Sequence, residues 1–303
     1  MITRDTDAFV EFARSSNPDF GPACARGVFL VAPEDFSLAE QSASDNRYMD
    51  LQVGVDPARA AAQHRQLHLA LSESLPTVCF PGSAATPDAI FPNNVFATAP
   101  GRVLLAHMRH PVRQAEADRA DIRRFFTGLL GYREIDLRAR PGVGELTGSL
   151  VIDRARGLGY CGLSERCDEA GAAAMHEAFG LRATLVFDLA AQEYHTNVVL
   201  SVLAGRAAVI APGGFADPAV AEAITSVYLP HVLPLSEAEK LAFAGNCLAL
   251  AADQAWMSRA ADQALSPGNR AALTAAGFQV RSVALDELEK AGGSLRCCVG
   301  EIY

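Results

Sequence analysis

Basic charge is scarce in this chain. Its 303 residues include 26 Lys and Arg against 35 Asp and Glu, which leaves a net charge of −9 at neutral pH. A nucleic-acid partner requires a basic surface that neutralises phosphates, so the acidic balance argues against that class. Long apolar runs are absent too. No charge-free stretch reaches about 18 apolar residues, and we therefore expect no membrane-spanning helix and no membrane partner.

Cysteine spacings typical of structural sites are also missing. The seven cysteines are an odd number, and no pair has C-x-x-C spacing. This pattern argues against a disulfide framework or a zinc site and favours reduced thiols, so we expect a cytoplasmic protein. Residues 1–14 alternate charged and single apolar residues, without the apolar core of a signal peptide. Hydrophobic residues make up 50% of the chain, which is enough for a sizeable core and excludes a disordered protein.

Short apolar runs bounded by turn residues predict buried strands, and longer stretches between them predict helices. Strands are expected at residues 28–31, 77–80, 103–106, 149–152, 184–187, 198–203, 207–210 and 247–251. Helices are expected at residues 58–74, 112–129, 165–179, 216–227, 236–243 and 266–275, the last with Ser266 and Pro267 as its start and Gly277 as its stop. The alternation indicates an α/β or an α+β fold.

Some of these strands follow each other too closely for a simple βαβ order. Residues 149–152 pair with 157–161, and residues 195–203 with 207–210, each pair across a short turn. A helix and another strand follow each pair. The pattern predicts a ββαβ unit that occurs several times without a visible sequence repeat.

Four segments carry polar residues inside apolar surroundings, and each has a structural alternative. Residues 91–96, Phe-Pro-Asn-Asn-Val-Phe, could be only a turn. Residues 142–149 place Glu145 in a glycine-rich loop before a strand, where it is a candidate acid, base or cation anchor or simply part of a loop. The loop lacks the phosphate-binding pattern G-x-x-x-x-G-K-[ST].

The other two segments contain a histidine and a cysteine pair. In residues 194–200 a strand would put His195 and Asn197 on one face, although a lone histidine is more often a core residue. In residues 292–303, Gly-Gly precedes Arg296 and Cys297-Cys298, and a neighbouring cation favours thiolate. The alternative is two small apolar residues in a last strand. A cysteine and a histidine that converge would form a nucleophile with its acid/base partner.

Together these segments resemble the guanidino-group-modifying superfamily, the penteins. Its members include arginine deiminase, dimethylarginine dimethylaminohydrolase, amidinotransferases and arginine dihydrolases. The motifs of this sequence are most similar to those of the related citrulline hydrolases. The resemblance spans residues 28–303 and rests on the motifs at residues 91–94, 194–198, 243–246 and 292–297. It implies a five-bladed α/β propeller of ββαβ modules around a polar central site. We expect a single catalytic domain over residues 1–303, with residues 1–27 as an N-terminal extension.

The resemblance also implies the roles of individual residues. Cys297 matches the nucleophile, His195 the general acid/base, and Glu145 the carboxylate that positions the substrate nitrogens and the histidine. Arg113 and Arg166 resemble the arginines that hold the substrate α-carboxylate, a task suited to a bidentate guanidinium. Further substrate-binding residues are expected in two of the motifs: Phe91, Asn93, Asn94 and Asn197.

Two of these positions depart from the deiminase pattern. Asn94 and Asn197 stand where deiminases usually have aspartates that bind the guanidinium. The change should weaken cation binding, since each charge-assisted bond contributes about 1.5–3 kcal/mol, whereas an amide can pair with a neutral ureido group. The Asn at 94 also resembles arginine and succinylarginine dihydrolases. The departure therefore favours hydrolysis that continues to ornithine or a similar amine.

The resulting hypothesis is a cysteine hydrolase of a linear C–N bond in a ureido or guanidino amino acid, citrulline or arginine, with no metal or organic cofactor. The alternatives are arginine deiminase or dimethylarginine dimethylaminohydrolase activity, amidino transfer, and a non-catalytic protein that binds arginine or citrulline. The expected partner is a small amino-acid substrate, and a homo-oligomer is compatible with the sequence. Residues 46–49 are either a substrate loop or a surface turn, and the surface turn is slightly favoured.

Overall fold

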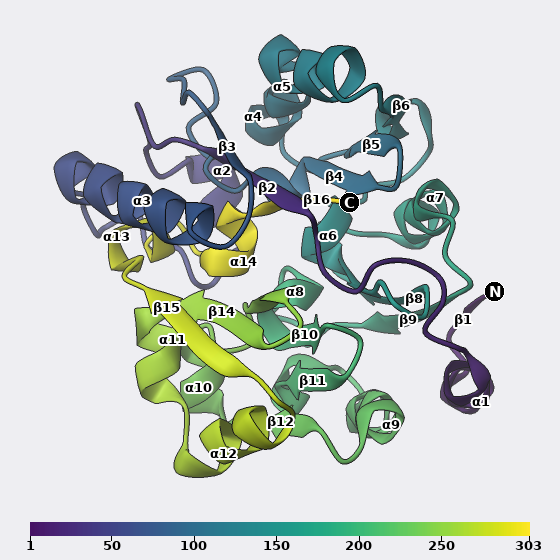
Figure 1. The fold of residues 1–303 in the computed structure, drawn as a ribbon. Helices are drawn as coiled ribbons and strands as arrows, with labels where there is room; N and C mark the ends of the chain where they lie inside the picture. The colour runs from purple at the N-terminus through teal and green to yellow at the C-terminus, as the bar shows by residue number, and fades with distance from the viewer.

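Five small β-sheets surround a common centre in the computed structural model, which describes residues 1–303 (Figure 1). In each sheet the innermost strand is antiparallel to the middle strand, and the middle strand is parallel to the third. Innermost strands of several neighbouring sheets contact one another. The ββαβ repeat expected from the strand pairs is therefore confirmed.

The strands follow the chain around the ring. The first sheet to be completed holds β4 (Phe96–Ala99), β5 (Arg102–Leu105) and β6 (Arg133–Asp136). The next two hold β7 (Leu150–Asp153), β8 (Leu158–Leu163) and β9 (Ala183–Asp188), then β10 (Leu200–Leu203), β11 (Ala207–Ile210) and β12 (Val232–Pro234). The last two hold β13 (Leu248–Ala251), β14 (Gln254–Ser258) and β15 (Gln279–Val283), then β16 (Gly300–Ile302), β2 (Gly27–Val31) and β3 (Thr77–Phe80).

The last sheet joins the two ends of the chain. Strand β16 pairs with β2 in antiparallel register, with Gly300 opposite Phe29. A Cβ at Gly300 would lie 2.2 Å from the Phe29 ring, so only glycine allows this pairing. The ring is thus closed by the segment that follows Cys297, which fixes the cysteine pair at the centre.

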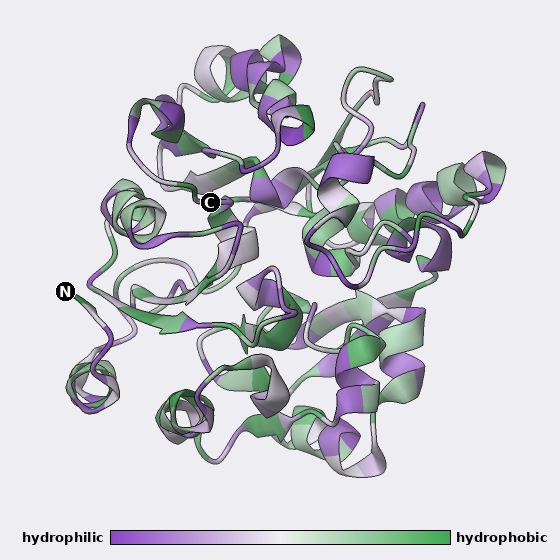
Figure 2. Cartoon of the chain, turned by 180° about the vertical axis from the view of Figure 1, so that it is seen from behind, coloured by the Kyte–Doolittle hydropathy of each residue, from purple (hydrophilic) through white to green (hydrophobic).

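The longer helices lie at the rim and cover the sheets (Figure 1). They are α3 (Pro57–Ser72), α5 (Ala120–Arg124), α7 (Glu169–Phe179), α9 (Pro218–Tyr228), α10 (Glu237–Leu241), α11 (Arg259–Ala264) and α12 (Pro267–Ala275). Shorter helices are α2 (Glu40–Ala43), α4 (Pro111–Gln114), α6 (Leu146–Ser149), α8 (Thr196–Val199), α13 (Asp286–Glu289) and α14 (Leu295–Cys298). Hydrophilic residues concentrate on the rim helices, whereas the strands are largely hydrophobic (Figure 2). None of the helices is long and apolar enough to cross a membrane.

Residues 1–26 pack onto the ring. Strand β1 (Ile2–Thr3) extends the sheet of β7–β9 by pairing parallel to β9. Helix α1 (Thr6–Ser15) begins at the N-cap Asp5 and buries Phe9 and Ala13 against α9 and β9.

Several sequence-based boundaries need correction. The expected helix at 112–129 is broken into α4, a 3₁₀ turn (Ala115–Asp118), α5 and a π turn (Phe125–Leu129), because Arg119 adopts a non-helical ψ of 97°. The expected helix at 165–179 begins only at Glu169, where Asp168 caps it through Gly171 N. The start at Ser266 is confirmed, since its hydroxyl accepts from Asn269 N. Strands β1, β4, β6, β12, β14 and β15 were not expected from the sequence.

Candidate active site

The turn that leads into each innermost strand carries a site residue. Because the five innermost strands lie around one axis, these turns meet at one end of it. The turns are the 3₁₀ turn Pro92–Asn94 before β4, α6 before β7, α8 before β10, residues 243–246 before β13, and α14 before β16. They bring together residues more than 200 positions apart in the sequence, from Asn94 to Cys297.

Helix α8 changes the expected geometry of the histidine segment. His195 is the extended residue before the helix and Asn197 lies inside it, so the two do not share one face of a strand as expected. The strand itself begins only at Leu200. Tertiary contacts hold this turn: Thr196 Oγ1 donates to Ser149 O at 2.6 Å, and Asn197 Nδ2 donates to Thr147 O at 3.1 Å. Ser149 likewise belongs to α6 and not to the expected strand.

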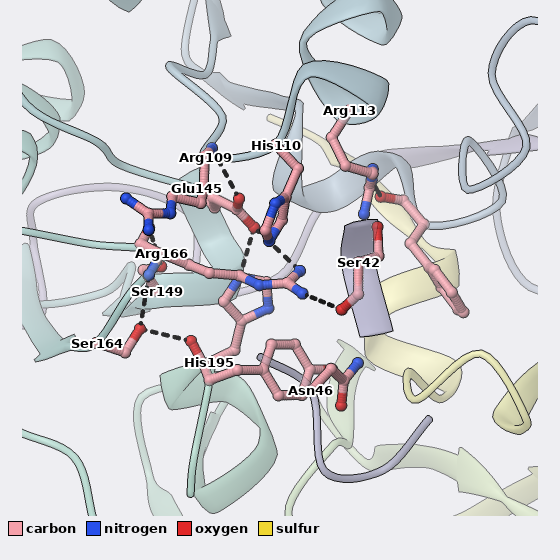
Figure 3. Close-up of polar contacts among 12 residues, drawn as sticks. Ser42, Asn46, Arg109, His110, Arg113, Glu145, Ser149, Ser164, Arg166 and His195 are labelled. Atoms are coloured by element: carbon pink, nitrogen blue, oxygen red, sulfur yellow. Dashed lines mark hydrogen bonds and ion pairs between the residues drawn. The ribbon is translucent and has the colours of Figure 1, made fainter. Parts of the chain in front are cut away.

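Glu145 and His195 form a fully buried pair. Nε2 of His195 lies 2.8 Å from Oε2 of Glu145, and Arg109 N donates to Oε1 at 3.1 Å (Figure 3). Burial raises the pKa of Glu145, but the Arg166 charge and the bond from His195 outweigh it and lower the pKa to about 2. The carboxylate is therefore ionised across the physiological range.

The ionised carboxylate determines which histidine nitrogen carries the proton. A carboxylate can only accept, so Nε2 must be the protonated nitrogen and Nδ1 the one with a free lone pair. Nδ1 is buried and has no hydrogen-bond partner. Burial lowers the pKa of His195, although Glu145 opposes this, so the ring is neutral at pH 7. This is the state of a general base.

Cys297 sits at the centre of the five turns with 1% of its surface exposed. Asn246 brackets it: Nδ2 lies 3.3 Å from Sγ, and Oδ1 accepts from Cys297 N at 3.3 Å. Asn197 Nδ2 lies 3.8 Å from Sγ. Burial raises the pKa of the thiol, and the bond from Asn246 and the Arg296 charge only partly oppose it. The Arg296 charge lowers the pKa of the Cys297 thiol, as expected from the sequence, but its guanidinium is paired with Glu301 at 2.8 Å. The pKa of the thiol is raised on balance, so the resting group is a thiol.

A narrow cavity opens onto Cys297. Besides the cysteine it is lined by residues from several segments: Ser42, Asn46, Met49, Asp88, Phe91, Asn94, Arg113, Arg166, Tyr194, Ala291 and Gly293. Asn46 is 5% exposed and donates to Gly292 O at 3.4 Å, and Met49 bridges to Ala291. Asn46 and Met49 thus line the cavity, whereas Arg47 is exposed, so the favoured interpretation of residues 46–49 as only a surface turn is wrong for two of the four residues.

Arg113 lies in this wall but is already engaged by the protein. It is 2% exposed, and its Nε and Nη2 bond the Glu116 carboxylate at 2.5 and 3.1 Å. Nη2 also donates to Phe91 O at 3.0 Å.

Arg166 is held in the same manner from another side. It lies between Glu145 and Ser42 (Figure 3), with Nη2 2.5 Å from Asp45 Oδ1 and 2.7 Å from Ser42 O. Its Nη1 lies 3.6 Å from Glu145 Oε2, and its guanidinium stacks 4.9 Å from the Tyr194 ring centre. In both arginines Nη1 makes no hydrogen bond within the protein.

The Phe-Pro-Asn-Asn segment contributes to the floor of the site. Asn93 Nδ2 and Thr147 Oγ1 lie 3.4 Å apart, and Thr147 Oγ1 donates to Asn93 O, so Asn93 ties this turn to α6. Asn94 Oδ1 is buried without a partner. A Cβ at Gly148 would lie 2.8 Å from that oxygen and 2.7 Å from His195 Cε1. Glycine here makes room for two site residues.

Some site residues were not selected from the sequence. Asn246 had a signal in the motif at 243–246, but no role was assigned to it. Asp88, Ser42 and Asp45 had none, because nothing near them interrupts an apolar pattern. No group of three or more His, Cys, Asp or Glu side chains is arranged to hold a metal ion.

Fold and site together place the chain in the pentein, guanidino-group-modifying superfamily. The family model for eukaryotic N,N dimethylarginine dimethylhydrolase matches residues 32–303. The chain therefore belongs to the dimethylarginine dimethylaminohydrolase family, whose members hydrolyse guanidino C–N bonds, and the resemblance inferred from the four motifs is confirmed.

Individual relatives agree with this assignment. The N(G),N(G)-dimethylarginine dimethylaminohydrolase of Mycobacterium tuberculosis is 27% identical over 98% of this chain and 93% of its own length. The protein YkgA of Bacillus subtilis is 24% identical over 89% of each. Among solved structures, the N-terminal domain of ArgZ, an arginine dihydrolase of cyanobacteria, superposes with a TM-score of 0.79 at 20% identity, covering 91% of this chain and 97% of the domain. A dimethylarginine dimethylaminohydrolase gives 0.72 at 19% identity, covering 92% and 100%.

Proposed function

We propose that this protein hydrolyses a C–N bond at the guanidino carbon of a free arginine-like amino acid, with Cys297 as nucleophile. One observation carries the proposal. Buried acceptors without partners, Asn94 Oδ1 and His195 Nδ1, belong to the turns that meet at the thiol. Each buried polar atom left unpaired costs about 1–3 kcal/mol. A guanidinium offers five N–H donors and no acceptor, so it satisfies these atoms better than a ureido group does.

The first half of the reaction forms a thiol-linked intermediate. Cys297 loses its proton, which a water molecule relays to the free Nδ1 of His195 because the two side chains are not hydrogen-bonded to each other, and the thiolate attacks the guanidino carbon. A bound cation favours this step because it stabilises the thiolate that burial disfavours. The C–N bond to the terminal nitrogen then breaks, and His195 returns the proton so that ammonia, or an amine from a substituted arginine, departs.

The second half releases the product. His195, again neutral, takes a proton from a water molecule whose oxygen attacks the same carbon. The C–S bond breaks, Cys297 recovers a proton through His195, and a ureido amino acid is formed. Glu145 keeps the proton on Nε2 throughout, which leaves Nδ1 available in each step. A structure of the ArgZ domain with a covalently bound reaction intermediate supports a covalent route in a protein of this fold.

Charge around the cavity also favours a cationic substrate. Two guanidinium groups face four carboxylates in and next to its wall: Arg113 and Arg166 against Asp45, Asp88, Glu116 and Glu145. An arginine side chain would balance part of this excess, whereas citrulline would not.

A second hydrolysis, from the ureido product to ornithine, is the other candidate. The observation that favours it is the amide at position 94, which keeps a second negative charge away from the reacting carbon. The ureido product can then remain long enough for another attack, since it does not face two carboxylates.

The test is product analysis with arginine, dimethylarginine and citrulline, measuring ammonia, dimethylamine, citrulline and ornithine over time. Cys297→Ala is the inactive reference, and Cys298→Ala is its matched control because the adjacent thiol is equally buried. Release of ammonia or dimethylamine only when Cys297 is present is the expected result. Ornithine without lasting citrulline would establish the second hydrolysis, and no product from any of the three compounds would refute the proposal.

A further inference from the structure

A groove lies at the end of the ring opposite the catalytic cysteine. Each innermost strand runs away from the turn that carries a site residue, so the hairpin turn that follows the strand lies at the far end. There the β4–β5 turn, the residue after β7, the end of α7 and residues 20–22 enclose the groove. Its lining has no acidic side chain and includes three aromatic rings, a leucine and two arginines: Phe20, Phe179, Tyr303, Leu181, Arg102 and Arg154.

Neither of the two arginines has a carboxylate partner, although the chain carries a net charge of −9. Arg102 Nη1 donates to Ala178 O at 3.1 Å, and Arg154 Nη1 donates to a carbonyl oxygen of β4 at 3.0 Å. These backbone carbonyls are the only hydrogen-bond acceptors that the two guanidinium groups have within the protein. Glu301 is the carboxylate whose charge acts on Arg154, but Arg296 binds it at 2.8 Å. The groove therefore holds two cations without counter-charges.

The protein fixes Arg154 and the aromatic rings in place. The guanidinium carbon of Arg154 lies 4.2 Å from the Tyr303 ring centre and 5.1 Å from that of Phe179. Thr98 holds this arrangement from both sides, since its carbonyl accepts from Arg154 and its Oγ1 accepts from Tyr303 N at 2.9 Å. The guanidinium is thus presented between two rings, with its other nitrogens available to a ligand.

We infer that this groove binds a small organic anion with one carboxylate or phosphate group on an apolar or aromatic body. The guanidinium groups of Arg102 and Arg154 supply the paired N–H donors that an oxyanion accepts. The aromatic rings and Leu181 supply an apolar surface for the rest of the molecule. The innermost strands separate this groove from the cavity at Cys297, so it is a second site and not part of the one that binds the substrate.

The experiment measures anion binding by isothermal titration at constant ionic strength. Benzoate and phenyl phosphate combine the two expected features, benzyl alcohol lacks the charge, and inorganic phosphate lacks the ring. In Arg154→Gln the dissociation constant for the two aromatic anions should rise by about 10- to 100-fold, as expected for the loss of hydrogen bonds to a charged group. Arg133→Gln, at an exposed arginine in β6, is the matched control and should bind them as the wild type does.

A second pair of variants covers the case in which Arg154→Gln does not fold. Gly180 ends α7 with a φ of 67°, and a Cβ there would lie 3.5 Å from Arg102 Nη2. Aspartate and asparagine are the residues that tolerate this conformation best after glycine. Gly180→Asp would place a carboxylate of the protein itself beside Arg102 and should weaken binding at least about tenfold, whereas the neutral Gly180→Asn should keep it.

Binding of either aromatic anion to the wild type, with this pattern among the variants, supports the inference, and the tighter of the two identifies the charged group. Equal affinity in all the variants would place the anion elsewhere and overturn it, as would no binding to the wild type up to about 10 mM. Displacement of bound benzoate by arginine would assign the anion to the cavity at Cys297 and also overturn it. Inorganic phosphate that binds as tightly as phenyl phosphate would overturn the role of the rings.

Discussion

The glycine of α6 offers a sharp test of how the site is built. In Gly148→Ala the new Cβ would lie 2.7 Å from His195 Cε1 and 2.8 Å from both His195 Nδ1 and Asn94 Oδ1. Ordinary contacts of a Cβ begin at 3.4 Å, so the imidazole must move by roughly 0.7 Å or more. The backbone itself tolerates alanine, because Gly148 has no positive φ and lies in a helical turn.

The size of the effect follows from what His195 does. Displacing a catalytic group by about 1 Å can reduce the rate about 100-fold, and general acid–base catalysis contributes about 100- to 10,000-fold in total. We therefore expect kcat to fall at least about 100-fold. Overpacking of this kind costs roughly 1–3 kcal/mol of the free energy of unfolding, so the folded protein should remain, with a melting temperature lowered by a few degrees.

The assay pairs ammonia release from arginine with a thermal melt. Gly268→Ala is the matched control, since a Cβ at that helical glycine meets nothing within 4 Å, and it should keep full activity and equal or higher stability. A Gly148→Ala protein with kcat within threefold of wild type would refute either the position of His195 beside Gly148 or its role as the acid/base.

Four further predictions concern the thiol and the residues of the cavity around it. Cys297→Ala should abolish turnover with little change in melting temperature, whereas Cys298→Ala should stay active; the opposite result would reassign the nucleophile. Burial raises the pKa of the Cys297 thiol above its ordinary value near 9. The thiolate fraction, and with it kcat/KM, should therefore increase with pH up to and beyond that value. A pH profile of kcat/KM that is flat above neutrality would contradict this. In Asn246→Ala the pKa-lowering hydrogen bond to the sulfur is lost, so the same rising limb should shift to higher pH. Arg166→Lys should mainly raise KM, since an ammonium cannot keep the bonds to Asp45 and Ser42 and bind a carboxylate as well; a loss confined to kcat would indicate a different role.

Local sequence pattern determined the class of fold and the chemistry-bearing residues. Short apolar runs bounded by turn residues predict strands, and the strands at 77–80 and 207–210 have the expected bounds. The second of these strands is fully buried. Cys297, His195 and Glu145 stood out because each interrupts such surroundings with a reactive group. Caps such as Ser266 are local as well, since a side chain there bonds a backbone N–H three residues away.

Tertiary structure alone decided how these residues are arranged and which others join them. Asp45 and Arg166 are 121 positions apart, and Cys297 and Asn246 are 51 apart, so no local pattern links them. The helical turn at 196–199 exists because Ser149 and Thr147 accept its side-chain hydrogen bonds, against a sequence that reads as strand. Ring closure brings the five turns to one end of the axis. Burial there keeps His195 neutral and the thiol protonated, whereas the Arg166 charge and the bond from His195 keep Glu145 ionised against the effect of burial.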